Sequence, residues 1–265
     1  MYDLAALESS KEHGIAKTVF AGKMHYSAVT GSTNSDAMSA ARGGAPHGSV
    51  FITDEQTAGR GRGDHGWHSD SGEGLYVSVL LRPQIAPAQL PLIPLAAGLA
   101  AANAIRSVAS LTVDLRWPND LLIGPRKAGG ILVEAHSEGN VVSYAVVGIG
   151  INVHQQTFPA TLSTPATSLD VEAGRRISRQ KLLVALLKSL EKEALALIDK
   201  RAASEVLTRV TQASTWIRGR QVEVHGPQAC EGVTEGLDEH GFLLVRTSTG
   251  LVTVQTGGIR QKIQE

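Results

Sequence analysis

The spacing of apolar residues changes twice along this 265-residue chain, and this change limits the fold more than any other feature of the sequence. Between about residues 17 and 156, short runs typical of β-strands alternate with glycine-rich loops. From residue 178 onward, apolar residues recur at steps of three and four, which predicts an amphipathic helix. After Trp216 short alternating runs return. This order predicts an α+β fold, with a mixed-sheet domain followed by a small β-barrel.

The same patterns locate the expected elements. Strands are expected at 50–53, 75–81, 130–135 and 141–153, helices at 36–42, 92–109, 178–198 and 202–210, and barrel strands at 222–225, 232–237, 242–246 and 251–255. We expect a lead segment at 1–22, a larger domain at 23–213 and a barrel domain at 214–265. About fifty residues is close to the lower limit for independent stability, so the barrel should pack against the larger domain.

Composition excludes several classes of function. Lysine plus arginine equals the acidic residues at 25 each, so no overall charge favours DNA or an anionic membrane, and any contact with an anion must be local. Cys230 is the only cysteine, which excludes an intramolecular disulfide and is typical of the reducing cytoplasm. The first residues lack the pattern of a secretory signal. The longest uncharged stretch, 83–105, contains four prolines, so no membrane span is expected.

A glycine-rich loop at 55–63 carries the strongest chemical signal. Its alternating glycines expose successive backbone N–H groups, and Arg60 and Arg62 add fork-shaped donors, which together suit a carboxylate or a phosphate. A flexible surface loop of the RGG kind is the alternative interpretation. The loop lacks the terminal Lys-Ser/Thr of a P-loop, and it does not open a helix as a dinucleotide fingerprint does.

Two further loops place polar groups together. Ser32, Thr33 and Asn34 could bind a ureido or amide ligand, or could cap the helix that follows. The run Trp117-Pro118-Asn119-Asp120 leaves a carboxamide beside a carboxylate, although a plain turn explains it nearly as well. Lys127 precedes two glycines and a β-type run, so its ammonium is either solvated or beside a bound anion.

Taken together, in this order and spacing, these segments resemble the biotin protein ligases from about residue 23 to residue 263. The resembling segments are Gly-Ser-Thr-Asn at 31–34, Gln-Thr-Ala-Gly-Arg-Gly-Arg at 56–62 with Trp67 beyond, Trp-Pro-Asn-Asp at 117–120, Lys-Ala-Gly-Gly-Ile-Leu at 127–132 and Gly-Ile-Gly-Ile-Asn-Val at 148–153. The resemblance implies a catalytic α+β domain followed by an SH3-like barrel. The catalytic fold is shared with the lipoate ligases.

The resemblance also implies a role for each matching residue. The catalytic residues would be Lys127, which contacts the carboxylate of biotin, and Arg62, which orders around the acyl-adenylate. The remaining biotin contacts would come from Ser32, Thr33, Asn34, Gln56, Gly59, Arg60, Gly61 and Gly130. Trp67 would stack near the adenine, and Asn119, Asp120 and Asn152 would line the nucleotide and metal side. No metal ligand is assigned.

The implied reaction has two steps. Biotin's carboxylate attacks the α-phosphorus of magnesium–ATP to give biotinyl-5′-adenylate, and a lysine of a biotin carboxyl carrier protein domain then attacks the mixed anhydride. A lipoate ligase and a biotin-binding module without turnover are the alternatives. Some relatives also repress transcription through an N-terminal DNA-binding domain of about sixty residues, and only about thirty residues precede Ser32, so no DNA contact is expected. A homodimer is left open.

One departure from the family concerns the end of the glycine-rich loop. Many relatives continue with basic residues after the position of Arg62, whereas this chain has Gly63-Asp64-His65-Gly66, which either weakens retention of the adenylate or lengthens the hinge. His65 and His68 lie near two aspartates in the sequence. We expect no metal site there, because the loop lacks a scaffold that would present these side chains on one face.

Overall fold

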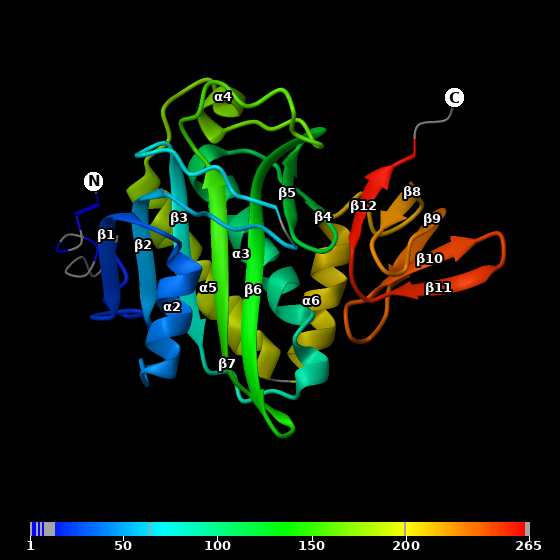
Figure 1. Ribbon diagram of the computed structural model, residues 1–265, viewed down its shortest axis with the longest axis horizontal. Coiled ribbons are helices and arrows are strands. Elements are labelled where there is room, and N and C mark those ends of the chain that lie inside the picture. The colour runs from blue at the N-terminus through cyan, green and yellow to red at the C-terminus, as the bar shows by residue number, and fades with distance from the viewer. Residues whose placement is uncertain are drawn as a thin grey trace.

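The computed structural model describes residues 2, 3, 5, 7, 14–63, 65–198 and 200–262. Figure 1 shows two sheets, a large one with helices on its faces and a small one at the side of the molecule. The predicted α+β class is confirmed, with a mixed sheet followed by an antiparallel one.

The large sheet has seven strands in the order β1-β2-β3-β7-β6-β5-β4. Only β1 and β2 pair in parallel, and the other neighbours are antiparallel. The strands are β1 (Met24–Thr30), β2 (Val50–Gln56), β3 (Gly74–Leu81), β4 (Asp114–Arg116), β5 (Asp120–Ile123), β6 (Arg126–Glu138) and β7 (Val141–Asn152).

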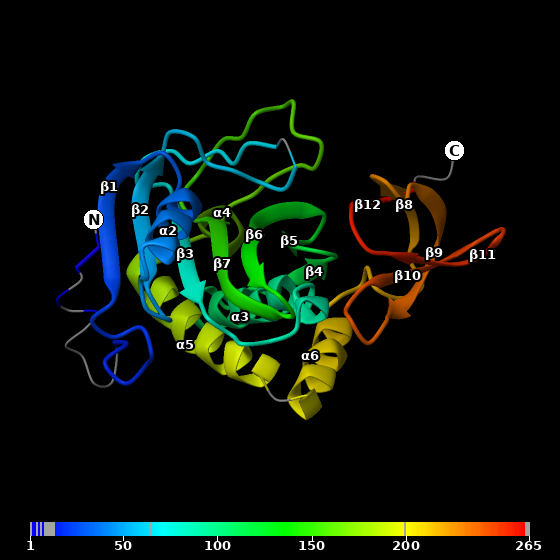
Figure 2. The same cartoon turned by 60° about the horizontal axis from the view of Figure 1, so that its bottom comes forward.

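Helices cover the two faces of this sheet unequally (Figure 2). On one face, α2 (Thr33–Arg42) packs through Ala37 and Ala41 on a small apolar cluster. The longer helices lie on the other face: α3 (Leu92–Ala109), α5 (Arg179–Ile198) and α6 (Lys200–Gln212). All eight residues of β3 are buried, which explains why its sequence is a continuous apolar run instead of an alternating one.

Helix α3 is the central helix of the apolar layer. Alanines at 96, 97, 100, 101 and 104 are buried, and their small side chains let α3 approach α5 closely. Leucines 182, 183, 186, 187 and 190 of α5 are buried as the three-and-four spacing predicts. Within the described residues, one stretch, 87–109, has the length and composition to cross a membrane, and 67% of its most apolar window is buried inside the protein.

The second sheet is antiparallel, in the order β11-β10-β9-β8-β12. Its strands are β8 (Gln221–His225), β9 (Cys230–Leu237), β10 (Leu243–Thr247), β11 (Gly250–Val254) and β12 (Gly258–Gln261), which form the predicted SH3-like barrel. The barrel packs against the larger domain, where the buried indole of Trp117 donates a 3.0 Å hydrogen bond to the carbonyl of Gly241. The short elements η1 (Pro87–Gln89) and α4 (Leu169–Ala173) complete the fold.

Several elements differ from the sequence-based expectation, among them β6, which begins at Arg126 instead of at 130, and α4, for which no helix is expected. Strands β1, β4, β5 and β12 were not expected, because β1 has a mostly exposed edge pattern and the others have only three or four residues. Helix α2 begins at Thr33, so Asn34 lies in its first turn instead of before it. Ser32 stands at the N-cap position of α2 in an extended conformation, and its carbonyl accepts a 3.0 Å bond from the Asp36 N–H, but its side chain makes no capping bond.

Candidate active site

A cavity of about 610 Å³ opens where the ends of β6 and β7 meet the glycine-rich loop and the barrel. It is lined by every catalytic or binding residue predicted from the sequence except Gly59. Gly59 instead shapes the loop, because its carbonyl accepts a 2.9 Å bond from the Trp67 amide and a Cβ at this position would collide with the Trp67 carbonyl. The cavity therefore brings together residues that are far apart in the sequence.

One wall of the cavity is a polar network at the start of α2. The side-chain carbonyl of Gln56 accepts bonds from the backbone N–H of Thr33 (2.9 Å) and from its hydroxyl (3.2 Å). The buried Ser78 hydroxyl donates to Asn34 Oδ1 (2.6 Å) and lies 2.8 Å from Thr33 Oγ1. The Gln56 amide donates to Ser69 Oγ (2.9 Å). These bonds hold amide and hydroxyl groups in fixed orientations beside the cavity.

The floor of the cavity consists of glycines on β6 and β7. A Cβ on Gly148 would collide with the carboxamide of Asn34, and a Cβ on Gly150 would lie 2.6 Å from the Trp67 indole. At Gly130 a Cβ would lie 3.3 Å from the same ring. The bare backbone therefore lets flat groups lie directly on the sheet.

Trp67 itself faces this floor and presents an unused donor. Its indole N–H is buried and has no hydrogen-bond partner among the residues that the structure describes. Since an unmet buried donor is costly, a ligand oxygen is a fitting partner for this group.

Three charged side chains from three neighbouring strands meet at the opposite wall. Asp120 Oδ1 lies 2.6 Å from the ammonium of Lys127, and Asp120 Oδ2 accepts from Arg116 Nη2 (2.6 Å) and Nε (3.1 Å). Burial alone would raise the pKa of Asp120, but Lys127 and Arg116 outweigh it and lower the pKa overall. Asp120 is thus an anion at neutral pH, and it points the Lys127 ammonium into the cavity.

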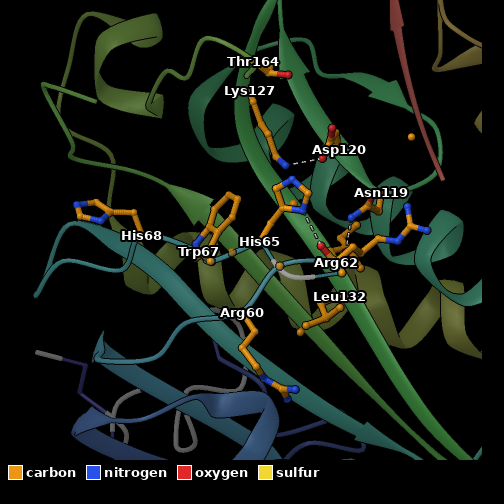
Figure 3. Close-up of a pocket in the computed structure, with 18 of the residues that line it drawn as sticks. Arg60, Arg62, His65, Trp67, His68, Asn119, Asp120, Lys127, Leu132 and Thr164 are labelled. Atoms are coloured by element: carbon orange, nitrogen blue, oxygen red, sulfur yellow. Dashed lines mark hydrogen bonds and ion pairs between the residues drawn. The ribbon is translucent and has the colours of Figure 1, made fainter. Parts of the chain in front are cut away.

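The glycine-rich loop contributes a further cation. Arg62 donates a 2.8 Å hydrogen bond to the Gly257 carbonyl of the barrel, and burial lowers its pKa, opposed by the charge of Asp120. Figure 3 shows Arg62 and Lys127 on two sides of the same space, with His65 between them. Arg62, Lys127 and Arg116 thus place positive charge around the carboxylate of Asp120. This space is therefore suited to an anion, although the whole chain has no net charge.

The two predicted asparagines hold backbone segments. Asn119 donates to the carbonyl of Ile131 (2.7 Å), which fixes the turn between β4 and β5 against β6. Asn152 is buried and donates to the carbonyl of Thr167 (3.0 Å), next to the segment that pairs with Lys127. Both asparagines line the cavity and also hold the backbone segments around it.

The four-residue metal cluster considered from the sequence does not come together in the described part of the chain. His68 lies 3.0 Å from Asp70, and both side chains are more than half exposed. His68 also points away from His65 in Figure 3, and Asp64 lies outside the described residues. Across residues 14–63, 65–198 and 200–262, no group of three or more histidines, cysteines or carboxylates could hold a metal ion.

Sequence reasoning missed several residues of the site. Arg116 stands directly before the Trp-Pro-Asn-Asp run and could have been found there. Ser78, which orients Asn34, lies within an apolar run and has no local sequence signal. The barrel turn at 256–260 and the loop at 158–166 also line the cavity.

Comparison with known protein families agrees with this site. The model of the Biotin/lipoate A/B protein ligase family matches residues 26–152, and the model of the Biotin protein ligase C terminal domain matches residues 218–259. The fold and site therefore define the class of biotin and lipoate ligases. Within this class, the chain belongs to the biotin protein ligase family.

Individual relatives cover most of the chain. A Bacillus subtilis protein named bifunctional ligase/repressor BirA is 34% identical over 95% of this chain and 78% of its own. The biotin--[acetyl-CoA-carboxylase] ligase of Mycobacterium tuberculosis is 33% identical over 88% of this chain and 86% of its own. The solved biotin protein ligase from Aquifex aeolicus in complex with biotin and ATP has a TM-score of 0.79 at 27% identity, over 91% of this chain and 100% of that one.

Proposed function

We propose that this protein activates biotin as biotinyl-5′-adenylate with magnesium–ATP and transfers the biotinyl group to a lysine of a biotin carboxyl carrier protein domain. This proposal rests on the position of the Lys127 ammonium. Asp120 holds the ammonium between the glycine floor and the polar wall on one side and Arg62 on the other. Biotin and ATP are the molecules bound in the solved relative, and the carboxylase acceptor is the one that the name of the Mycobacterium tuberculosis relative gives.

The polar wall suits the fused-ring head of biotin. A ureido group presents one carbonyl acceptor and two N–H donors, and Thr33, Asn34 and Gln56 provide amide and hydroxyl partners of both kinds. The glycines of the floor let the Asn34 carboxamide and the Trp67 ring lie directly against the sheet beside this wall. Ser32 is buried at the same wall and completes it.

In the first step, a carboxylate oxygen of biotin attacks the α-phosphorus of ATP, the bond from this phosphorus to the bridging oxygen breaks, and pyrophosphate leaves with the electron pair. Two anions must approach each other, so positive charge has to be in place beforehand. Lys127 holds the carboxylate, and Arg62 exchanges its bond to Gly257 for the phosphate. Donors placed in this way stabilise the charge that develops in the transition state.

In the second step, the neutral amine of the acceptor lysine attacks the acyl carbon, and AMP leaves with the bonding electrons. A proton is released from the new amide nitrogen. The mixed anhydride must be kept from water until the acceptor docks, and the loop of Arg60 and Arg62 lies over the cavity in a position to do so. The barrel turn closes the far side.

Magnesium enters this proposal as part of the ATP substrate. The carboxylate of Asp120 is already engaged by Arg116 and Lys127, so the described residues offer no cage for a resident metal. Magnesium commonly stays on substrate phosphates with one or two protein carboxylates. We place the reaction in the cytoplasm, which fits a chain with one cysteine.

The test is pyrophosphate release with magnesium–ATP and either biotin or lipoate, followed by mass analysis of an added carrier domain. We expect biotin-dependent release and one biotinyl mass increase on the acceptor. Pyrophosphate release with lipoate alone would identify a lipoate ligase. Binding of biotin without pyrophosphate release would identify a binding module without turnover.

A further inference from the structure

One carboxylate oxygen of Glu134 joins the polar wall to the glycine-rich loop. Glu134 Oε2 accepts a 2.8 Å hydrogen bond from the Asn34 amide and a 2.6 Å bond from Arg60 Nη2. Glu134 lies on β6, Asn34 in the first turn of α2 and Arg60 in the loop, so three separate segments meet at a single atom.

The orientation of Asn34 directs its amide nitrogen toward β6. Its side-chain oxygen accepts from Ser78, so its nitrogen must face β6, where it reaches Glu134 and, at 3.3 Å, the Leu132 carbonyl. Asn34 is 4% exposed, whereas the Glu134 and Arg60 side chains are 26% and 44% exposed. The Asn34 end of the link is therefore fixed, and the Arg60 end is open enough to break and re-form.

We propose that Glu134 is a positioning residue that keeps the glycine-rich loop over the bound acyl-adenylate. It does so by accepting hydrogen bonds from Arg60 and Asn34 at the same carboxylate oxygen. This inference rests on the proposed function. Glu134 touches no substrate and acts through its two partners. The same amide that faces the head of biotin thereby anchors the loop, while the second arginine, Arg62, stays free to exchange the barrel carbonyl for phosphate.

The decisive variant is Glu134→Gln, which keeps a carbonyl acceptor for Asn34 and removes the charge that holds Arg60. Enzyme loaded with labelled adenylate is chased with unlabelled biotin, and release of the label is followed. Loss of a hydrogen bond to a charged group predicts release about tenfold faster. Pyrophosphate formation in a single turnover at saturating substrates should change less than about twofold, because Lys127 and Asp120 are untouched.

A double variant and a matched control separate positioning from mere stability. Arg60→Gln alone should also speed release, and the Glu134→Gln/Arg60→Gln pair should release no faster than either single variant, because the two changes remove one contact. Glu235→Gln removes a similar carboxylate–arginine pair with Arg246 on the barrel and should leave release unchanged. Release at the wild-type rate from Glu134→Gln, or multiplied effects in the double variant, would overturn the proposal.

A measurement without substrates tests the same anchor independently of the chemistry. Brief trypsin treatment of the ligand-free protein should cut after Arg60 and Arg62 faster in Glu134→Gln than in the wild type, with thermal unfolding unchanged. Equal cutting rates would contradict the anchoring role. If the wild type forms no adenylate, the proposed function is wrong, and the trypsin result still decides whether Glu134 holds the loop.

Discussion

Lys127 and Asp120 form a 2.6 Å ion pair between adjacent strands of the large sheet, with the Lys127 ammonium 5.4 Å from the centre of the Trp67 ring. Asp120 is in turn held by Arg116, so the lysine is fixed through a chain of charges and not by the turn alone. Figure 3 shows the resulting direction of the ammonium, toward the space between the loop and β6. The chemistry of the site depends on this relationship.

Replacing Lys127 by alanine should slow adenylation about a hundredfold or more. The change removes a positioned donor worth roughly 3 kcal/mol in a transition state that gathers negative charge. Pre-steady-state pyrophosphate release measures the effect, and exposed Lys181→Ala on α5 serves as the matched control. Wild-type rates in Lys127→Ala would contradict the assignment.

Replacing Asp120 by asparagine should lower the free energy of unfolding by about 3 kcal/mol at pH 7. The change leaves the buried guanidinium of Arg116 without its anionic partner. The expected deficit is measured by urea unfolding of both proteins. An equal stability at neutral pH would show that the ion pair contributes little.

The stability difference between the wild type and Asp120→Asn should depend on pH. The folded-state pKa of Asp120 is lowered from the ordinary value of 3.8, so its stabilisation is present above that value and is lost as the pH falls toward the folded pKa. The difference in unfolding free energy between the wild type and Asp120→Asn should therefore shrink below about pH 4. A difference that grows on acidification would contradict the direction of the shift.

Replacing Gly148 by alanine should weaken biotin binding at least about tenfold. The added methyl group would collide with the Asn34 carboxamide, which must then leave its bond to Ser78, and overpacking of this kind costs roughly 1–3 kcal/mol. Calorimetric titration with biotin measures the loss. Gly43→Ala is the control, since its Cβ would meet neighbours only at ordinary contact distances of 3.4 Å or more.

Replacing Glu193 by glutamine should reduce stability without affecting catalysis. Glu193 on α5 is fully buried and makes two bonds to Arg209 of α6, at 2.6 and 2.8 Å. Breaking the pair should cost about 3 kcal/mol and lower Tm by several degrees, roughly 2–4 °C per kcal/mol for a chain near this size. Calorimetry checks the shift, and the adenylation rate at 25 °C should stay at the wild-type value.

The local elements and the types of group near the cavity could be predicted from the order of the amino acids. Continuous apolar runs located β3, β7 and α3, and apolar residues spaced three and four apart located α5, because each of these elements buries the positions that its pattern marks. The glycine-rich loop indicated anion binding through its own backbone donors and arginines. The ordered motifs identified the biotin protein ligase resemblance, which the comparisons confirmed.

The contacts between residues far apart in the chain could not be predicted in this way. Short strands β4 and β5 bring Arg116 and Asp120 to Lys127, and neither strand is long enough to carry a periodic signal. Ser78 orients Asn34 across 44 residues of sequence, Glu134 meets Asn34 across 100, and Arg62 reaches the barrel across 195. Hydrogen bonds and ion pairs act over a few ångströms, and sequence spacing does not give the distance between segments brought together by sheet pairing and barrel packing.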